Sequence, residues 1–313
     1  MGARIANNLA IISEEKGAYI RARELASRAR QIFVEYGDRR NQSYASGNLA
    51  NLQMQAGRFR EATELFTTAD RIFVHLGELH PHHYTIGNLA DIDLVLGRIS
   101  AAIEKYENVM AYAKSCGDKE LEAETAVRLT ECAFYGGETE GVGARYQEAI
   151  DIAKEAGSLE YQTRGTVGYC RHLIGLRDVD SARVRVAQLE KIAADMNSLR
   201  NLNEAKFLQG ELSRITGDTA NAVALYNETN CYAREQEQFE LLLKSLVRLA
   251  EVDDLNAEKH RAELAKLMDR FSGWNGNDIL QALLASRYYG YFQATLQEAL
   301  KLSDIGRCLY SVG

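Results

Sequence analysis

Apolar residues recur along the chain at the spacing of an α-helix. In one representative stretch they fall at i, i+4, i+7, i+8 and i+11, at Leu65, Ala69, Ile72, Phe73 and Leu76. The whole chain contains a single proline, Pro81, and long helices exclude proline because its ring clashes with the preceding turn. The pattern therefore predicts an all-α protein.

Glycines divide these predicted helices at a constant interval. One stands every 20 residues, eight times in succession, at Gly17, Gly37, Gly57, Gly77, Gly97, Gly117, Gly137 and Gly157. Gly217 rejoins the series after it lapses at Arg177 and Asn197. A glycine just past a helix end adopts the left-handed conformation without steric cost. We therefore expect helices of about 15 to 18 residues, each ending at a member of this series.

Small residues form columns with twice that period, which makes the repeating unit two helices long. One column follows alternate glycines and reads Ala22, Ala62, Ala102, Val142, Ala182 and Ala222. A second column reads Ala29, Ala69, Val109 and Ala149. Small side chains let two helices cross closely, and stacked helix pairs bury a continuous core. The predicted units of 40 residues span about 3–37, 38–77, 78–117, 118–157, 158–197 and 198–237, with a degenerate seventh over 238–272.

These columns resemble the tetratricopeptide repeat (TPR), which has a leucine and a small residue in its first helix, a glycine at the turn, and two alanines in its second helix. Two stretches carry the resemblance best, Asn48-Leu49-Ala50…Gly57…Ala62…Ala69 and Asn88-Leu89-Ala90…Gly97…Ala102. It covers residues 3–236 well and the remainder loosely. The early tryptophan and late proline of the 34-residue form are missing, so the chain is similar to the 40-residue class. That class occurs in Pins-type adaptors and in sensor domains of bacterial signalling ATPases and transcription activators.

The resemblance implies a right-handed superhelical solenoid of antiparallel helix pairs. It places the repeats in residues 1–272 and capping helices in residues 273–313. The segment Ser272–Asn277 is expected to break the pattern, and Asp278 to cap the following helix. The aromatic residues of the final stretch are expected to cover the end of the core, at Tyr288, Tyr289, Tyr291 and Phe292.

The first helix of each pair is expected to line the concave face, where repeat proteins bind extended partners. On the family pattern the residue before the leucine column points inward, and here it reads Asn8, Asn48, Asn88 and Arg128. An asparagine offers both a donor and an acceptor, so this column could hydrogen-bond the main chain of a bound peptide. Alternatively, the asparagines bridge neighbouring helices or meet water. Further candidates on the same face are Tyr44, Asn51, Tyr84, Asp91 and Glu131.

Other kinds of chemistry find little support in the sequence. The net charge of −7 disfavours a nucleic-acid binder, and we interpret the arginine-rich stretch from Arg21 to Arg40 as a solvated helix face. We expect His80-Pro81-His82-His83 to be a solvated loop at a helix start rather than a metal site. No nucleophile elbow, phosphate-binding loop or dinucleotide fingerprint occurs, so neither an enzyme nor a cofactor is expected.

The sequence thus favours a cytoplasmic protein-interaction scaffold that binds a peptide or a helix of a partner in its groove. Five dispersed cysteines fit reduced thiols, and no apolar stretch is long enough to span a bilayer. An alternative is a ligand-sensing module of a multidomain bacterial signalling regulator, because the chain opens almost directly into a repeat helix. Self-association through Tyr288 to Phe292 is a third hypothesis, so the oligomeric state stays open.

Overall fold

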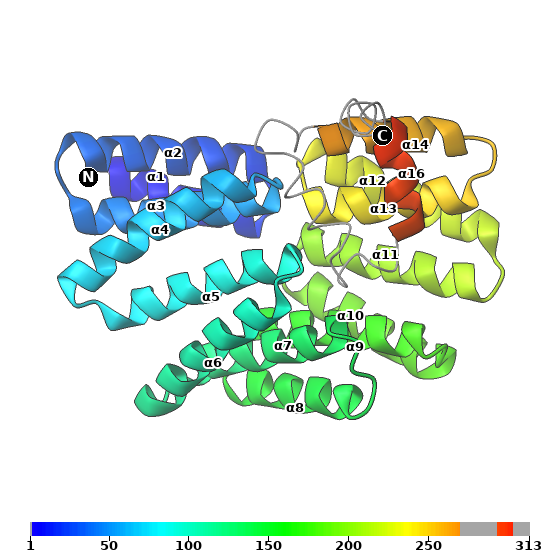
Figure 1. Ribbon diagram of the computed structural model, residues 1–313, viewed down its shortest axis with the longest axis horizontal. Coiled ribbons are helices and arrows are strands. Elements are labelled where there is room, and N and C mark those ends of the chain that lie inside the picture. The colour runs from blue at the N-terminus through cyan, green and yellow to red at the C-terminus, as the bar shows by residue number, and fades with distance from the viewer. Residues whose placement is uncertain (1, 270–292, 303–313) are drawn as a thin grey trace, which may run out of the picture.

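The computed structural model of the protein describes residues 2–269 and 293–302, and these ranges contain helices and no strands (Figure 1). The helices are α1 Gly2–Glu15, α2 Tyr19–Glu35, α3 Arg39–Gln55, α4 Phe59–Leu76, α5 Leu79–Val95, α6 Ile99–Cys116, α7 Lys119–Tyr135, α8 Val142–Glu155, α9 Leu159–Gly175, α10 Val179–Asp195, α11 Leu199–Ile215, α12 Thr219–Glu235, α13 Phe239–Val252, α14 Ala257–Asp269 and α16 Gln293–Leu302. None of these helices is both long and apolar enough to cross a bilayer. The predicted break at 272–277, Asp278 and the aromatic residues 288–292 lie outside the described residues.

The helices form antiparallel pairs on the 40-residue period, and the pairs stack into a superhelix. Each odd-numbered helix from α1 to α11 packs against its own even-numbered partner, and each from α1 to α9 also contacts the next odd-numbered helix. We call the odd-numbered helices α1 to α13 the inner layer and the even-numbered helices α2 to α14 the outer layer. At the end of the stack, α16 packs on α14 and α13. The predicted all-α, TPR-like solenoid is confirmed.

The glycine series sets the helix ends, as predicted. The glycines from Gly17 to Gly157, together with Gly217, have φ values between 68° and 91°. Where the series lapses, the backbone keeps the same conformation: Arg177, Asn197 and Glu237 have φ values of 58°, 51° and 52°. The turn geometry is therefore imposed by the stacking of the pairs. At these three residues the backbone adopts the left-handed conformation, which non-glycine residues rarely take.

Replacing Arg177 with glycine is expected to raise the free energy of unfolding by about 0.5–1 kcal/mol, because glycine removes the Cβ clash of the left-handed conformation. Asn197→Gly is expected to gain less, since asparagine tolerates this conformation better. Denaturant unfolding of both variants beside the parent protein checks the prediction. Loss of stability in both would mean that these side chains contribute contacts that outweigh the strain.

The alanine column lies where the two layers meet, as predicted. Its members, including Val142, are fully buried. One helical turn further along the outer helices lie larger side chains that reach toward the inner layer. Three of these are fully buried tyrosines at the same position of their repeats, Tyr106, Tyr146 and Tyr226. Their hydroxyl groups bring hydrogen-bonding chemistry into the interface between the layers.

The histidine run begins a helix, so its interpretation as a loop is wrong. His80, Pro81, His82 and His83 all lie at the start of α5, where Pro81 is tolerated because the first helical amides have no partner. Each histidine faces a different neighbour: His80 Nε2 lies 2.8 Å from Asp118 Oδ2, and His82 Nδ1 lies 2.6 Å from Asp70 Oδ1. The ring of His83 stacks on Tyr112 with centroids 3.8 Å apart. Within the described ranges, no three potential ligands converge on a metal position.

The superhelix turns back on itself. Helices α2 to α4 meet α11 to α13 end to end, although they are far apart in the sequence (Figure 1). Arg23 on α2 forms an ion pair with Glu237, which follows α12 and lies 214 residues further along the chain. The two ends of the stack of repeats therefore touch.

Candidate functional site

The first three inner helices carry neutral hydrogen-bonding side chains. Asn8 on α1 is exposed, and Asn48 on α3 donates from Nδ2 to Asn7 Oδ1 at 3.2 Å. Asn51 and Asn88 are half-buried, and neither side chain forms a hydrogen bond with another described residue. One asparagine of the predicted column therefore bridges neighbouring helices, while other amides on this part of the inner layer are available to a ligand.

Two tyrosines of the predicted face lie near these amides. The hydroxyl of Tyr44 donates to Glu78 Oε2 at 3.1 Å, and its ring contacts the edge of Phe73. Tyr84 is half-buried, and burial together with the charge of Glu124 raises the pKa of its hydroxyl. Burial and the bond to Glu78 also raise the pKa of the Tyr44 hydroxyl, so both hydroxyls stay protonated at neutral pH, and that of Tyr44 already donates to Glu78.

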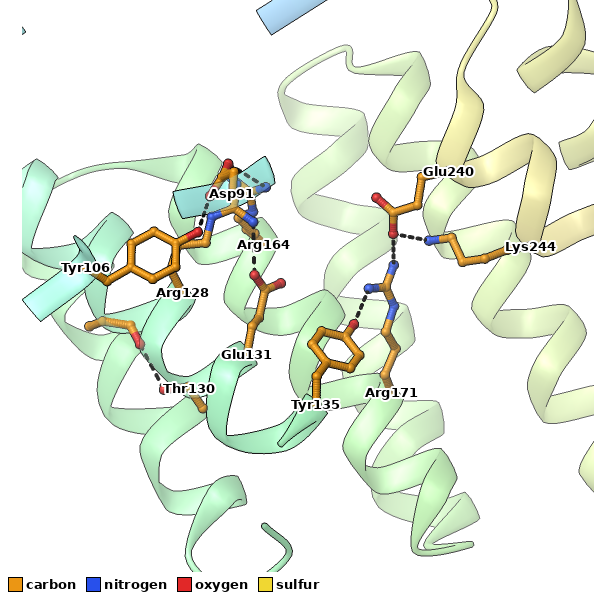
Figure 2. Close-up of polar contacts among 11 residues, drawn as sticks. Asp91, Tyr106, Arg128, Thr130, Glu131, Tyr135, Arg164, Arg171, Glu240 and Lys244 are labelled. Carbon is orange, nitrogen blue, oxygen red and sulfur yellow. Dashed lines mark hydrogen bonds and ion pairs between the residues drawn. The ribbon is translucent and has the colours of Figure 1, made fainter. Parts of the chain in front are cut away.

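The next predicted residues form a buried ion-pair network (Figure 2). Arg128 on α7 lies between two carboxylates: it pairs with Asp91 of α5 and donates from Nη1 to Glu131 Oε2 at 3.0 Å. The hydroxyl of Tyr106 on α6 donates to the other oxygen of Asp91. Asp91, Arg128 and Glu131 are each about 5–6% exposed, so in this conformation they hold two repeats together. A role for these three in partner binding stays a prediction.

The same arrangement recurs three repeats later. Arg248 on α13 makes a bidentate contact with Glu211 of α11, at 2.8 and 2.9 Å, and a third bond to Glu251 Oε2 at 2.5 Å. The hydroxyl of Tyr226 on α12 donates to Glu211, as Tyr106 does to Asp91. Two-oxygen contact with a guanidinium fixes orientation as well as distance. Each network therefore sets the relative position of two successive repeats.

A further network connects the two. Arg171 on α9 lies between Glu204 of α11 and Glu240 of α13 and donates from Nη1 to the hydroxyl oxygen of Tyr135 at 2.9 Å (Figure 2). Lys244 lies 3.2 Å from Glu204 and 2.9 Å from Glu240. Burial opposes ionisation of Glu204, but Lys244 and Arg171 hold the pKa of this carboxyl below its ordinary value. The inner layer from α5 to α13 is thus dense in paired charges.

Glu124 is the exception among these carboxyls, because no described cation lies within ion-pair distance of it. Its Oε2 accepts a hydrogen bond from the Tyr161 hydroxyl at 2.7 Å. Burial, and then the negative charge of Asp91, raise the pKa of Glu124 to about 7. The carboxyl is therefore poised to change charge near neutral pH.

The sequence analysis missed the networks of Arg171, Arg248 and Glu124. A signal for the second was present: Tyr226, Glu211, Arg248 and Glu251 repeat the positions of Tyr106, Asp91, Arg128 and Glu131 with a constant offset of three 40-residue units. Two repeats lie between them: in the second the arginine is replaced by Leu208, and in the first by Gly168, where a Cβ would lie 2.4 Å from Cε1 of Tyr146. The tyrosine ring fills the place of the arginine, which interrupts the series.

Comparison with known proteins agrees with this geometry. The family profile described as "Tetratricopeptide repeat" matches residues 3–73. The fold is similar over 99% of both chains to a Rap protein solved with Competence and Sporulation Factor, with a TM-score of 0.63 and 11% identity. Residues 3–73 thus match the tetratricopeptide repeat, and the whole chain has a TPR-like fold.

A second TPR structure extends the likeness. A signal transduction ATPase with numerous domains (STAND) from Pyrococcus horikoshii, which has a TPR sensor, is similar over 99% of this chain and 48% of its own, with a TM-score of 0.53 and 13% identity. Identities this low establish the fold alone. No curated protein matches the sequence.

Proposed function

We propose that this TPR protein is a non-catalytic, cytoplasmic scaffold that binds a peptide segment of a protein partner along its inner layer. TPR folds serve in general as protein-interaction scaffolds, and one similar structure is that of a Rap protein with Competence and Sporulation Factor bound. The observation that carries the proposal is the set of amides on α1, α3 and α5. Asn8, Asn51 and Asn88 form no side-chain hydrogen bond within the described ranges, and they lie on successive inner helices.

The chemistry of these helices suits an extended main chain. Amides spaced one repeat apart can donate to and accept from the peptide backbone whatever its sequence. Tyr44 and Tyr84 add apolar contact with a polar tip, as interface anchors do. The charges of the networks from α5 to α13 are paired with one another, so the amides on α1, α3 and α5 are the part that we expect to meet the peptide first.

Replacing Asn51 and Asn88 together with alanine is expected to reduce partner capture at least tenfold, because two backbone-directed hydrogen bonds are lost in a desolvated interface. The measurement is a pull-down from source lysate quantified by mass spectrometry. The matched control replaces Asn108 and Asn227, two exposed asparagines of outer helices α6 and α12. Equal capture by both double variants would refute a role for these inner-layer amides.

The second candidate is a sensor module for a small effector within a larger regulator. The similarity in fold to the STAND protein with a TPR sensor favours it. A thermal-shift screen of metabolites distinguishes the two, because a ligand that binds only the folded state raises the unfolding temperature. A stabilising metabolite, with no protein captured by the unmodified chain, would favour the sensor over the scaffold.

A further inference from the structure

The two ends of the superhelix meet at one acidic side chain. Glu237, in the turn between α12 and α13, pairs with Arg23 of α2, and its Oε2 lies 3.6 Å from Arg58 Nη2 at the start of α4. The Arg23 side chain is 11% exposed and that of Glu237 is 40% exposed, so the pair lies at the edge of the contact between the two ends. Next to it, Gln238 Nε2 lies 3.5 Å from Gln55 Oε1.

Apolar contacts surround this ion pair. The rings of Phe59 and Phe239 meet edge to face, with centroids 5.7 Å apart, and both are buried. A Cβ on Gly57 would lie 2.7 Å from Cγ of Phe239, and one on Gly17 would lie 3.0 Å from the Tyr232 hydroxyl oxygen. Of the glycine series, Gly17 and Gly57 are the two that are buried. The surfaces of the first two and last two repeats are thus fitted to each other at van der Waals distance.

Glu237 keeps a side chain at a turn position where glycine would be free of strain. Its φ of 52° is the left-handed conformation that glycine adopts freely, and position 237 continues the 20-residue glycine series. Arg177 and Asn197 occupy the same place in earlier repeats with the same conformation, yet neither pairs with a described charged group. At Glu237 the strained conformation coincides with ion pairs that join the two ends.

We propose that Glu237 with Arg23 and Arg58 forms a clasp that closes the superhelix into a ring, so that the inner layer takes a ligand with a free chain end and admits a segment between folded domains only after the clasp opens. The ligand class follows from topology. A peptide with a free chain end can pass through a closed ring, whereas a segment flanked by two folded domains cannot enter until the ring opens. This part rests on the proposed function, whereas the clasp itself does not.

Glu237→Gly tests the clasp directly, because glycine relieves the backbone strain of the turn while it removes the carboxylate. Spin labels are attached to Lys16→Cys and to native Cys231, both exposed, in a background with Cys116→Ser and Cys308→Ser. Cys132 and Cys170 are buried, and burial raises the pKa of each thiol to about 12, so they stay unlabelled. With Glu237 in place, the distance between the two labels is expected to have one narrow distribution. In Glu237→Gly we expect a broader distribution with a longer mean distance.

Arg177→Gly is the matched control, since it makes the same backbone change away from the clasp and is expected to keep the narrow distribution. Arg23→Gln, on the other side of the contact, is expected to reproduce the effect of Glu237→Gly. Unchanged distances in both clasp variants would overturn the proposal.

The ligand class is tested with two display libraries of random twelve-residue peptides. One library presents the peptide at a free chain end, and the other holds it between two folded domains. The unmodified protein is expected to enrich binders at least tenfold from the free-end library alone, and Glu237→Gly from both. Equal enrichment by the unmodified protein would overturn the ligand class. Enrichment from neither would refute the proposed peptide binding, while the label distances still decide the clasp.

Discussion

Replacing Arg128 with methionine is expected to lower the free energy of unfolding by about 3–5 kcal/mol at pH 7. The variant leaves Asp91 and Glu131 buried side by side without their cation, and an uncompensated buried charge is among the most costly defects that a substitution creates. Methionine keeps most of the volume and apolar stem of arginine, so the loss reports the charge rather than a cavity. Denaturant unfolding followed by circular dichroism measures it.

Two further variants separate the network from general damage. Arg145→Met removes an ion pair with Glu138 in which both side chains are about half exposed, and it is expected to cost less than about 1 kcal/mol. Adding Asp91→Asn and Glu131→Gln to Arg128→Met removes the stranded charges and is expected to recover most of the loss. A loss for Arg128→Met no larger than for Arg145→Met would contradict the structural role of the network.

Replacing Glu124 with glutamine is expected to stabilise the protein at pH 8 by up to about 3 kcal/mol. The pKa of Glu124 rises from 4.5 to about 7 on folding, and each unit corresponds to about 1.4 kcal/mol. Folding therefore favours the protonated carboxyl, whose contribution is fully present below about pH 4.5 and is lost as the pH rises through about 7. Glutamine stays neutral at every pH and avoids this loss.

The difference between the Glu124→Gln variant and the parent protein should shrink toward zero at pH 5. Thermal unfolding of both proteins between pH 5 and pH 8 measures it. Glu120→Gln, an exposed carboxyl on the same helix, is the matched control and should leave the pH profile unchanged. A stabilisation of Glu124→Gln that does not vary with pH would show that the carboxyl does not titrate in this window.

Local signals in the sequence were sufficient for the fold. The helix ends follow the glycine series because a left-handed residue is a local requirement, visible in one residue type at one spacing. The lapses at Arg177 and Asn197 show where this reasoning has its limit. There the stacking of neighbouring pairs holds the backbone in the left-handed conformation, and the residue types at these positions do not predict that conformation.

The candidate site was harder to predict because its character depends on pairs of residues. Asp91, Arg128 and Glu131 were expected to line a groove, and only the structure shows that they satisfy one another across α5 and α7. Periodicity assigns a residue to a helix face. The partner of an inward charge lies on a neighbouring helix, and which residue it is depends on how the two helices are aligned. Comparing the charged columns between repeats would have shown that Glu211, Arg248 and Glu251 recur together at the positions of Asp91, Arg128 and Glu131.

The contact between Arg23 and Glu237 could not be predicted, because it depends on the sum of small rotations from one repeat to the next. A slight change in that rotation at each of five interfaces would carry the ends past each other. The contact surfaces offer weak signals only: Gly17 and Gly57 belong to the general series, and Phe239 begins a helix like other apolar residues.

The meeting of the two ends also bears on how the molecule comes apart. In a linear stack of repeats, the terminal units have a single neighbour and fray first, so unfolding proceeds inward from the ends. Here α2 and the turn before α4 have a second neighbour supplied by α12 and α13. The N-terminal repeats are thereby coupled to the strongly apolar helix α13. We therefore expect the first and last repeats to unfold together rather than to fray one after the other.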